Sequence, residues 1–323
     1  MALRTRQPTG IPAYPIILVE GPEKVGKSYA AFALSASEKV GRTFVFEVGE
    51  RTADEYASLG PYEVVELDGT WTDFIQQMEA ATAEPQVDGK PNVIVIDSAT
   101  VLWDSLKDWV GNRAANSAAN RKLLTSDPDA AIIIGNNLWN DANSRWGKLI
   151  RLAREHQGPV IFTARSKVTA KIGPSGAPIA GQTEYKVETQ KHLPGQASAV
   201  VRIESPGVAQ LVGAWSLGLQ VPQKLPAEAT LEHLVFDIIG SGGFDHRAGA
   251  DPVYGRITDD AKTQLVELFE QDGYPNSEAK AAAAAIWNAS ACADLARGAE
   301  VSDEQWAALV AAATVAIDEE ANA

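Results

Sequence analysis

Eight consecutive residues constrain this 323-residue chain more than any other stretch. They are Gly21-Pro22-Glu23-Lys24-Val25-Gly26-Lys27-Ser28, and they match the phosphate-binding pattern G-x-x-x-x-G-K-S/T at every fixed position. The apolar residues 14–20 before them predict a buried strand, and the small apolar residues 29–36 after them predict a helix. Backbone N–H groups at the start of such a helix can point at an anion only where the loop is tight. The stretch therefore predicts a phosphate-binding loop.

The same pattern gives individual residues a chemical role. Lys27 is expected to reach the β- and γ-phosphates of ATP, and the Ser28 hydroxyl to complete the coordination of Mg²⁺. A chance match in a glycine-containing loop is the alternative, and the flanking strand and helix argue against it. The residues expected to contact ATP are Gly21, Pro22, Glu23, Lys24, Val25, Gly26, Lys27, Ser28 and Tyr29.

Further apolar runs predict strands at 42–48, 62–67, 92–98 and 159–163, and helical patterns lie between them. Alternating strands and helices are typical of a parallel sheet with crossover helices. Asp97 ends the run Val93-Ile94-Val95-Ile96, so it is expected beside the phosphate loop, where it can hold Mg²⁺ through water. A hairpin is expected at 199–214. Four tryptophans are expected to be packing anchors rather than base-stacking platforms: Trp103, Trp109, Trp139 and Trp146.

Composition predicts a division into a tail at 1–12, a core at 13–240, a linker at 241–255 and an acidic three-helix module at 256–323. The module contains thirteen acidic and four basic residues, a net charge of −9 out of −14 for the chain. The charge therefore does not exclude a nucleic-acid partner for the core. A single cysteine, Cys292, excludes an internal disulfide. No run approaches the ~18 apolar residues of a membrane span, so a soluble, cytoplasmic protein is expected.

Residues 165–191 contain five basic and two acidic residues, together with several glycines and prolines. This composition favours a mobile loop at the carboxyl edge of the sheet. Lys167, Lys171 and Lys186 are the candidates for contacting a phosphate backbone, and an ordinary solvated loop is the alternative.

With both motifs assigned, residues 14–215 resemble the ATPase core of the RecA-like recombinases. Val93-Ile94-Val95-Ile96-Asp97-Ser98 is similar to that family's Walker B strand, in which serine also follows the aspartate. Phe44-Val45-Phe46-Glu47-Val48-Gly49-Glu50 resembles the strand that ends in the catalytic glutamate. The resemblance implies that Glu50 activates water, with Glu47 as the alternative. It also puts Arg165 at the γ-phosphate sensor, where the family commonly has glutamine or histidine, and a DNA-binding loop after it.

Among these proteins, the chain resembles the short phage-encoded type that is used in single-strand annealing and has a minimal core. The resemblance implies an α/β fold, a RecA-like P-loop ATPase core with a mainly parallel sheet flanked by helices, plus a small C-terminal helical domain. It implies a Mg²⁺-dependent ATPase of phage DNA recombination that binds single-stranded DNA in an ATP-dependent manner. The expected working form is a homo-oligomeric ring or filament in the cytoplasm of a bacterial host, with a single-strand-binding protein or another recombination protein as a further candidate partner.

Two alternatives stay open. A nucleotide-gated loader or scaffold would bind a protein partner rather than DNA, and the acidic module is consistent with this alternative. A P-loop nucleotide kinase would need an arginine-rich lid, and the stretch after Arg165 contains too few arginines for one.

Overall fold

The computed structural model describes residues 12–173, 176–216, 219–227, 230–240, 256–271, 274–295 and 300–321. Almost all of the expected tail and the whole expected linker at 241–255 lie outside these residues. The contacts divide the chain into two units, 1–248 and 249–323. Each unit is described by itself.

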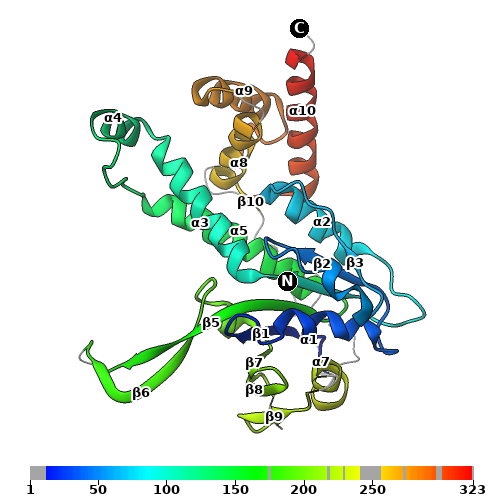
Figure 1. Ribbon diagram of the computed structural model, residues 1–323. Helices are drawn as coiled ribbons and strands as arrows, with labels where there is room; N and C mark the ends of the chain where they lie inside the picture. Colours follow the sequence, from blue (N-terminus) through cyan, green and yellow to red (C-terminus); the bar gives the residue numbers. More distant parts are fainter. Residues whose placement is uncertain are drawn as a thin grey trace, which may run out of the picture. The chain divides into compact units, whose positions relative to one another are not determined.

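The first unit is built on a nine-stranded sheet (Figure 1). Its path runs β3-β2-β4-β5-β1-β7-β8-β9, and β6 pairs with β5. From β3 to β7 all neighbours are parallel, whereas β6, β8 and β9 join by antiparallel pairing. The strands are β1 Ile16–Gly21, β2 Thr43–Glu47, β3 Glu63–Val64, β4 Val93–Asp97, β5 Val160–Ile172, β6 Pro178–Val187, β7 Ala199–Ser205, β8 Val208–Ala214 and β9 Gln223–Leu225.

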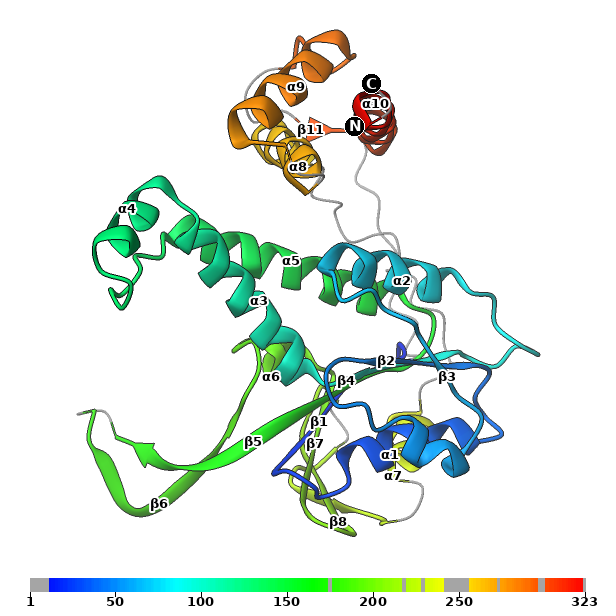
Figure 2. The same cartoon turned by 45° about the horizontal axis from the view of Figure 1, so that its top comes forward.

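Helices cover both faces of this sheet (Figure 2). Alternate residues of β1 enter opposite cores, as the period of a strand requires: Ile16 and Leu18 pack on one side, Ile17 and Val19 on the other. The first face is covered by α2 Trp71–Ala83, α3 Ala99–Ala115 and α5 Asn136–Glu155, and the second by α1 Lys27–Ala33 and α7 Thr230–Glu232. Shorter helical segments are 34–36, 54–59, α4 Ala118–Ser126, α6 Leu193–Gln196 and a π-helical turn at His233–Ile238. The predicted mainly parallel α/β sheet flanked by helices is confirmed.

The tryptophans between α3 and α5 pack as predicted where they reach the sheet. Trp146 is 1% exposed, and its ring lies 5.7 Å from that of Trp103 and 6.4 Å from that of Phe162. Trp109 is half-buried, with the Arg145 guanidinium 4.5 Å from its ring centroid. The described part of the chain contains no helix long and apolar enough to cross a membrane.

The sequence predicted one of the two hairpins of the sheet correctly and the other wrongly. The predicted β7–β8 hairpin, which turns at residues 206–207, is confirmed. The stretch expected to be a mobile loop instead forms an antiparallel ribbon of β5 and β6, which projects from the sheet (Figure 1). We call residues 166–172 and 178–187 the ribbon. This stretch forms strands instead of a loop because polar and apolar residues alternate from Lys167 to Ile172. That strand pattern outweighs the glycines and prolines near the tip.

The second unit contains the three predicted helices, α8 Thr258–Gln271, α9 Asn276–Ala289 and α10 Asp303–Ala321. A short antiparallel pair, β10 Arg256–Ile257 with β11 Glu300–Val301, was not predicted. Leu265, Phe269, Trp287 and Leu309 share one core. A capping box opens α10, because the Ser302 hydroxyl accepts from the Gln305 N–H at 3.2 Å and the Gln305 side chain accepts from the Ser302 N–H at 2.9 Å. The C-terminal helical unit that the sequence predicts is therefore confirmed.

Candidate active site

The phosphate loop, residues 21–28, joins the end of β1 to the start of α1. Gly26 has a φ of 98°, a conformation that glycine adopts without strain. A Cβ at Gly21 would lie 2.2 Å from the carbonyl oxygen of Ile203 in β7, so the loop approaches that strand too closely for any side chain. The helix's first backbone bond runs from Ala30 N–H to Gly26 C=O at 3.0 Å. The N–H groups of residues 27–29 therefore have no acceptor within the helix.

Lys27 turns its side chain back across this loop. Its Nζ donates to the carbonyl oxygen of Pro22 at 2.5 Å. Burial, the largest cause, lowers the pKa of Lys27, while the nearby carboxylates Asp97 and Glu50 act in the opposite direction. The ammonium group is thus partly dehydrated and surrounded by oxygen atoms, which is the setting that a phosphate group would complete.

Asp97 lies at the carboxyl end of β4 and is 1% exposed. The Thr163 hydroxyl donates to its Oδ1, and the Ser28 hydroxyl also hydrogen-bonds to this carboxyl group. Burial is the main cause that raises the pKa of Asp97, and these two hydroxyl groups act against it. Oδ2 is buried and has no hydrogen-bond partner among the described residues. A buried carboxylate oxygen beside a hydroxyl group is the donor set that Mg²⁺ prefers.

The two candidate glutamates lie in different surroundings. Glu47, the last residue of β2, accepts from the Ala53 N–H at 2.8 Å and thereby holds the following turn. Glu50 lies three residues on, is about one-third exposed, and accepts from Arg165 Nη2 at 3.0 Å. Arg165 Nη1 lies 3.6 Å from Glu23 of the phosphate loop. Of the two glutamates, Glu50 is the one that contacts Arg165 in the described part of the chain.

The structure therefore brings four of the predicted residues to one edge of the sheet. Lys27 follows β1, Glu50 follows β2, Asp97 ends β4, and Arg165 lies within β5 opposite Gly21. The carboxyl edge of a parallel sheet at a change in strand order is where such folds bind ligands. Among the described residues, no group of three or more His, Cys, Asp or Glu side chains could hold a metal by itself. A cation here would be held by Ser28, Asp97, nucleotide and water together.

The three candidate lysines of the ribbon lie apart from these four residues. Lys167 and Lys186 are register partners, so their side chains share one face of the ribbon, and Lys171 lies further along β5 at an irregularity in the strand pairing. All three are exposed. Lys167 Nζ pairs with Glu188 at 2.6 Å.

Two polar contacts near the phosphate loop were not predicted from the sequence. One is the Thr163–Asp97 bond, and the other joins Glu20, directly before Gly21, to Arg202 of β7. A signal for the second existed, because Glu20 is an acidic residue within an otherwise apolar buried strand.

The comparisons with known proteins agree with this geometry. The model of the AAA domain family matches residues 13–227. No curated protein matches the chain. Among solved structures, the RadB recombinase is similar at 16% identity and a TM-score of 0.31, covering 63% of this chain and 81% of its own. An ATPase of a type III secretion system of pathogenic bacteria is similar at 14% identity and a TM-score of 0.33, covering 93% and 81%.

Proposed function

We propose that this chain, which belongs to the AAA domain family, hydrolyses ATP with Mg²⁺ at the phosphate loop. The observation that carries the proposal is the convergence of Lys27, Ser28 and Asp97 beside a glycine loop that leaves three helix N–H groups without an intrahelical acceptor. Each of these groups lacks something that a nucleotide with its cation supplies. Among the described residues, Lys27 forms no ion pair at contact distance, and the buried Asp97 Oδ2 has no hydrogen-bond partner.

The residues present fit a magnesium ion. Ser28 and Asp97 would hold it, with Asp97 acting directly or through water. Bound Mg²⁺ would offset the negative charge on the phosphate groups. Because burial raises the pKa of Asp97, a nearby cation would also favour its ionised form and remove the electrostatic cost of the buried carboxylate.

Glu50 is proposed as the general base, and Arg165 as the group that controls it. In the structure the Arg165 guanidinium binds the Glu50 carboxylate at 3.0 Å, so this oxygen is occupied and is not free to accept from a water molecule. A γ-phosphate beside Arg165 would compete for the guanidinium and release Glu50. Glu50 then accepts a proton from the water whose oxygen attacks the γ-phosphorus, and the bond to the β-phosphate oxygen breaks to leave ADP and phosphate.

The ribbon is proposed to bind single-stranded DNA. Lys167 and Lys186 lie directly opposite each other on an exposed face, and a phosphate backbone along that face would compete with Glu188 for Lys167. In keeping with the resemblance to short phage-encoded recombination proteins, we propose that the protein acts as a ring or filament in single-strand annealing or recombination. Besides DNA, we propose a single-strand-binding protein as a protein partner.

Triple substitution of the ribbon lysines tests the DNA proposal. Lys167→Ala, Lys171→Ala and Lys186→Ala together should weaken single-stranded DNA binding and lower its salt slope by roughly two units, since each phosphate contact contributes about 0.7. The control variant replaces the exposed Lys107, Lys122 and Lys224 and changes the net charge equally. Equal affinities and slopes for the two variants would eliminate the ribbon.

Turnover with and without single-stranded DNA separates the proposed function from its alternatives. We expect Mg²⁺-dependent release of phosphate that DNA stimulates, more strongly at low than at moderate salt. Hydrolysis that DNA leaves unchanged would favour a loader or scaffold that acts on a protein. Transfer of the γ-phosphate to an added nucleotide instead of water would identify a kinase.

A further inference from the structure

A buried carboxylate lies immediately before the phosphate loop and takes no part in the chemistry proposed above. Glu20 is 1% exposed, at the end of a strand whose other residues are apolar except for the glycine that follows. Its Oε1 accepts from Arg202 Nε at 2.8 Å and from Nη2 at 2.5 Å. Its Oε2 is buried without a partner among the described residues. A buried ion pair of this kind stabilises a fold little more than apolar residues of similar volume would, so stability alone does not account for it.

Arg202 also contacts the ribbon. Its guanidinium carbon lies 3.9 Å from the centroid of the Tyr185 ring, within the range of a cation–π contact. Tyr185 belongs to β6 and is the register partner of Val168. It therefore lies on the face of the ribbon opposite to that of Lys167 and Lys186. The Arg202 guanidinium thus contacts both Tyr185, on the ribbon face opposite to Lys167 and Lys186, and Glu20, the residue directly before the phosphate loop.

The backbone makes this connection stiff. Glu20 and Arg202 are direct register partners in the parallel pair β1–β7. One residue further along, Gly21 lies so close to the Ile203 carbonyl oxygen that a Cβ would meet it at 2.2 Å. A shift of β7 at Arg202 and Ile203 must therefore move Glu20 and Gly21, and with them the loop that would hold the phosphates.

We propose that Arg202 is a positioning residue that couples the ribbon to the phosphate loop, because it joins the Tyr185 ring to the Glu20 carboxylate. The proposal rests on the proposed function, in which the ribbon binds single-stranded DNA and the loop binds ATP. DNA on the lysine face moves β6 and its Tyr185 ring, and the guanidinium passes the movement to β1. The coupling is reciprocal, so ATP changes the DNA affinity by the factor by which DNA changes the ATP affinity.

The decisive substitution is Tyr185→Ala, because it removes the ring and leaves the buried ion pair intact. Substituting Arg202 by an apolar residue would bury an unpaired Glu20 charge and could unfold the protein. Tyr185→Phe keeps the ring and is the matched control. Arg202→Lys keeps the charge but loses the planar group that stacks on the ring, so it should uncouple partially.

The readout is the ratio of single-stranded DNA affinities with and without a non-hydrolysable ATP analogue and Mg²⁺. A ratio between about 5-fold and 150-fold is typical of such coupling, and we expect Tyr185→Phe to retain the wild-type value. Tyr185→Ala should bring the ratio close to one, while DNA affinity without nucleotide and basal turnover stay within about threefold of wild type. A purely structural role for Tyr185 would instead lower both affinities and leave the ratio alone. A wild-type ratio in Tyr185→Ala overturns the proposal.

A second readout does not depend on DNA binding. Hydrogen exchange of the ribbon amides should change when the ATP analogue and Mg²⁺ are added to wild type or Tyr185→Phe, and should not change in Tyr185→Ala. If wild type binds no DNA but this pattern is found, the DNA function fails and the coupling stands. If nucleotide leaves ribbon exchange unchanged in wild type, the coupling is wrong even where DNA binds.

Discussion

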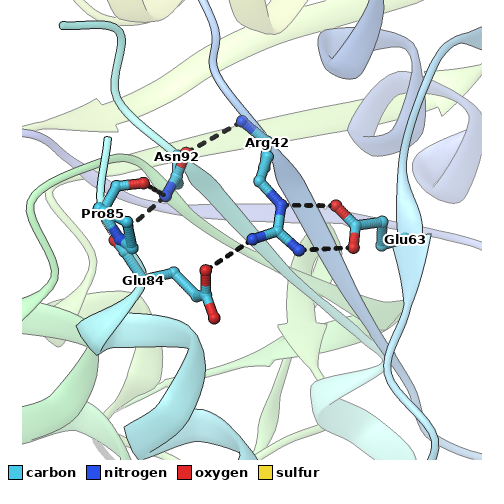
Figure 3. A network of polar contacts seen from close by, with 5 residues as sticks. All are labelled: Arg42, Glu63, Glu84, Pro85 and Asn92. Carbon is cyan, nitrogen blue, oxygen red and sulfur yellow. Dashed lines mark hydrogen bonds and ion pairs between the residues drawn. The ribbon is translucent and has the colours of Figure 1, made fainter. Parts of the chain in front are cut away.

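The two edges of the same parallel sheet differ in how their charged side chains are partnered. At the amino edge, Arg42 donates to both oxygens of Glu63 at 2.7 Å and to Glu84 at 2.6 Å (Figure 3). The Asn92 side chain accepts from the Arg42 N–H and donates to the carbonyl oxygens of Glu84 and Pro85. At the carboxyl edge, buried oxygens of Asp97 and Glu20 have no partner among the described residues.

The pKa values reflect the same contrast. The hydrogen bond to Glu63 is the main cause that raises the pKa of Arg42, and the same bond lowers the pKa of Glu63, so both groups are more easily charged than usual. Burial has the opposite effect on Lys27 and Asp97, which are harder to charge than usual. Charged groups that satisfy each other hold strands together, whereas the unpartnered carboxylate oxygen of Asp97 is available to a ligand. Substitutions at the two edges should therefore have separable effects on stability and on turnover.

The largest effect is expected from Lys27→Ala. It removes the half-buried cation of the phosphate loop, so turnover should fall by about 10³-fold and ATP binding should weaken. Thermal unfolding should stay near that of wild type, because Lys27 is already partly dehydrated in the fold. Lys107→Ala on the exposed surface of α3 is the control. Near-normal turnover by a purified, folded Lys27→Ala protein would contradict the assignment of the site.

Glu50→Gln and Glu47→Gln together should show which glutamate is the base. Glu50→Gln should keep ATP bound and lower turnover by about 10²- to 10⁴-fold, the usual contribution of a general base. Glu47→Gln should keep most activity, because an amide oxygen can still accept from the Ala53 N–H. Calorimetric ATP binding beside phosphate release measures both. The reverse result, with Glu47→Gln inactive and Glu50→Gln active, would move the role to Glu47.

The amino edge should respond through stability instead. Asn92 is 1% exposed, and Asn92→Ala leaves the backbone groups of Arg42 and the α2 terminus without their partner. The free energy of unfolding should fall by about 2 kcal/mol, the usual cost of unsatisfied buried groups. Turnover per folded molecule should not change. Urea unfolding and a turnover assay check this, and a large loss of turnover without loss of stability would break the contrast between the two edges.

Much of the carboxyl edge could be predicted because its signals are local. A glycine loop between a strand and a helix, and an acid at the end of an apolar strand, are visible within eight residues of sequence. The partners of these groups could not be predicted, since Thr163 is 66 residues from Asp97 and Arg202 is 182 residues from Glu20. Only the register of β1 with β7 brings that second pair together. The ribbon differs from the expected mobile loop because the alternation of polar and apolar residues along β5 favours a strand more strongly than the glycines and prolines near the tip oppose it.

The smallest effect is expected on the stability of Asp97→Asn without nucleotide. This measurement is also the sharpest test of the difference between the two sheet edges. Burial raises the pKa of Asp97 in the fold, so the folded protein binds the proton more tightly than the unfolded chain. The wild type should therefore lose stability as the pH rises from the unfolded pKa of about 4 through the raised folded value.

The substituted side chain of Asp97→Asn is neutral at every pH, so the variant does not lose stability in this way. At neutral pH its unfolding temperature should be slightly higher than that of wild type, and the difference should shrink toward pH 4. Calorimetric scans across this pH range measure the difference, and Asp108→Asn on the exposed side of α3 is the control. Added ATP and Mg²⁺ should reverse the order, because only the carboxylate can hold the cation. A variant less stable than wild type at neutral pH without nucleotide would mean that the carboxyl edge, like the amino edge, is already satisfied by its own residues.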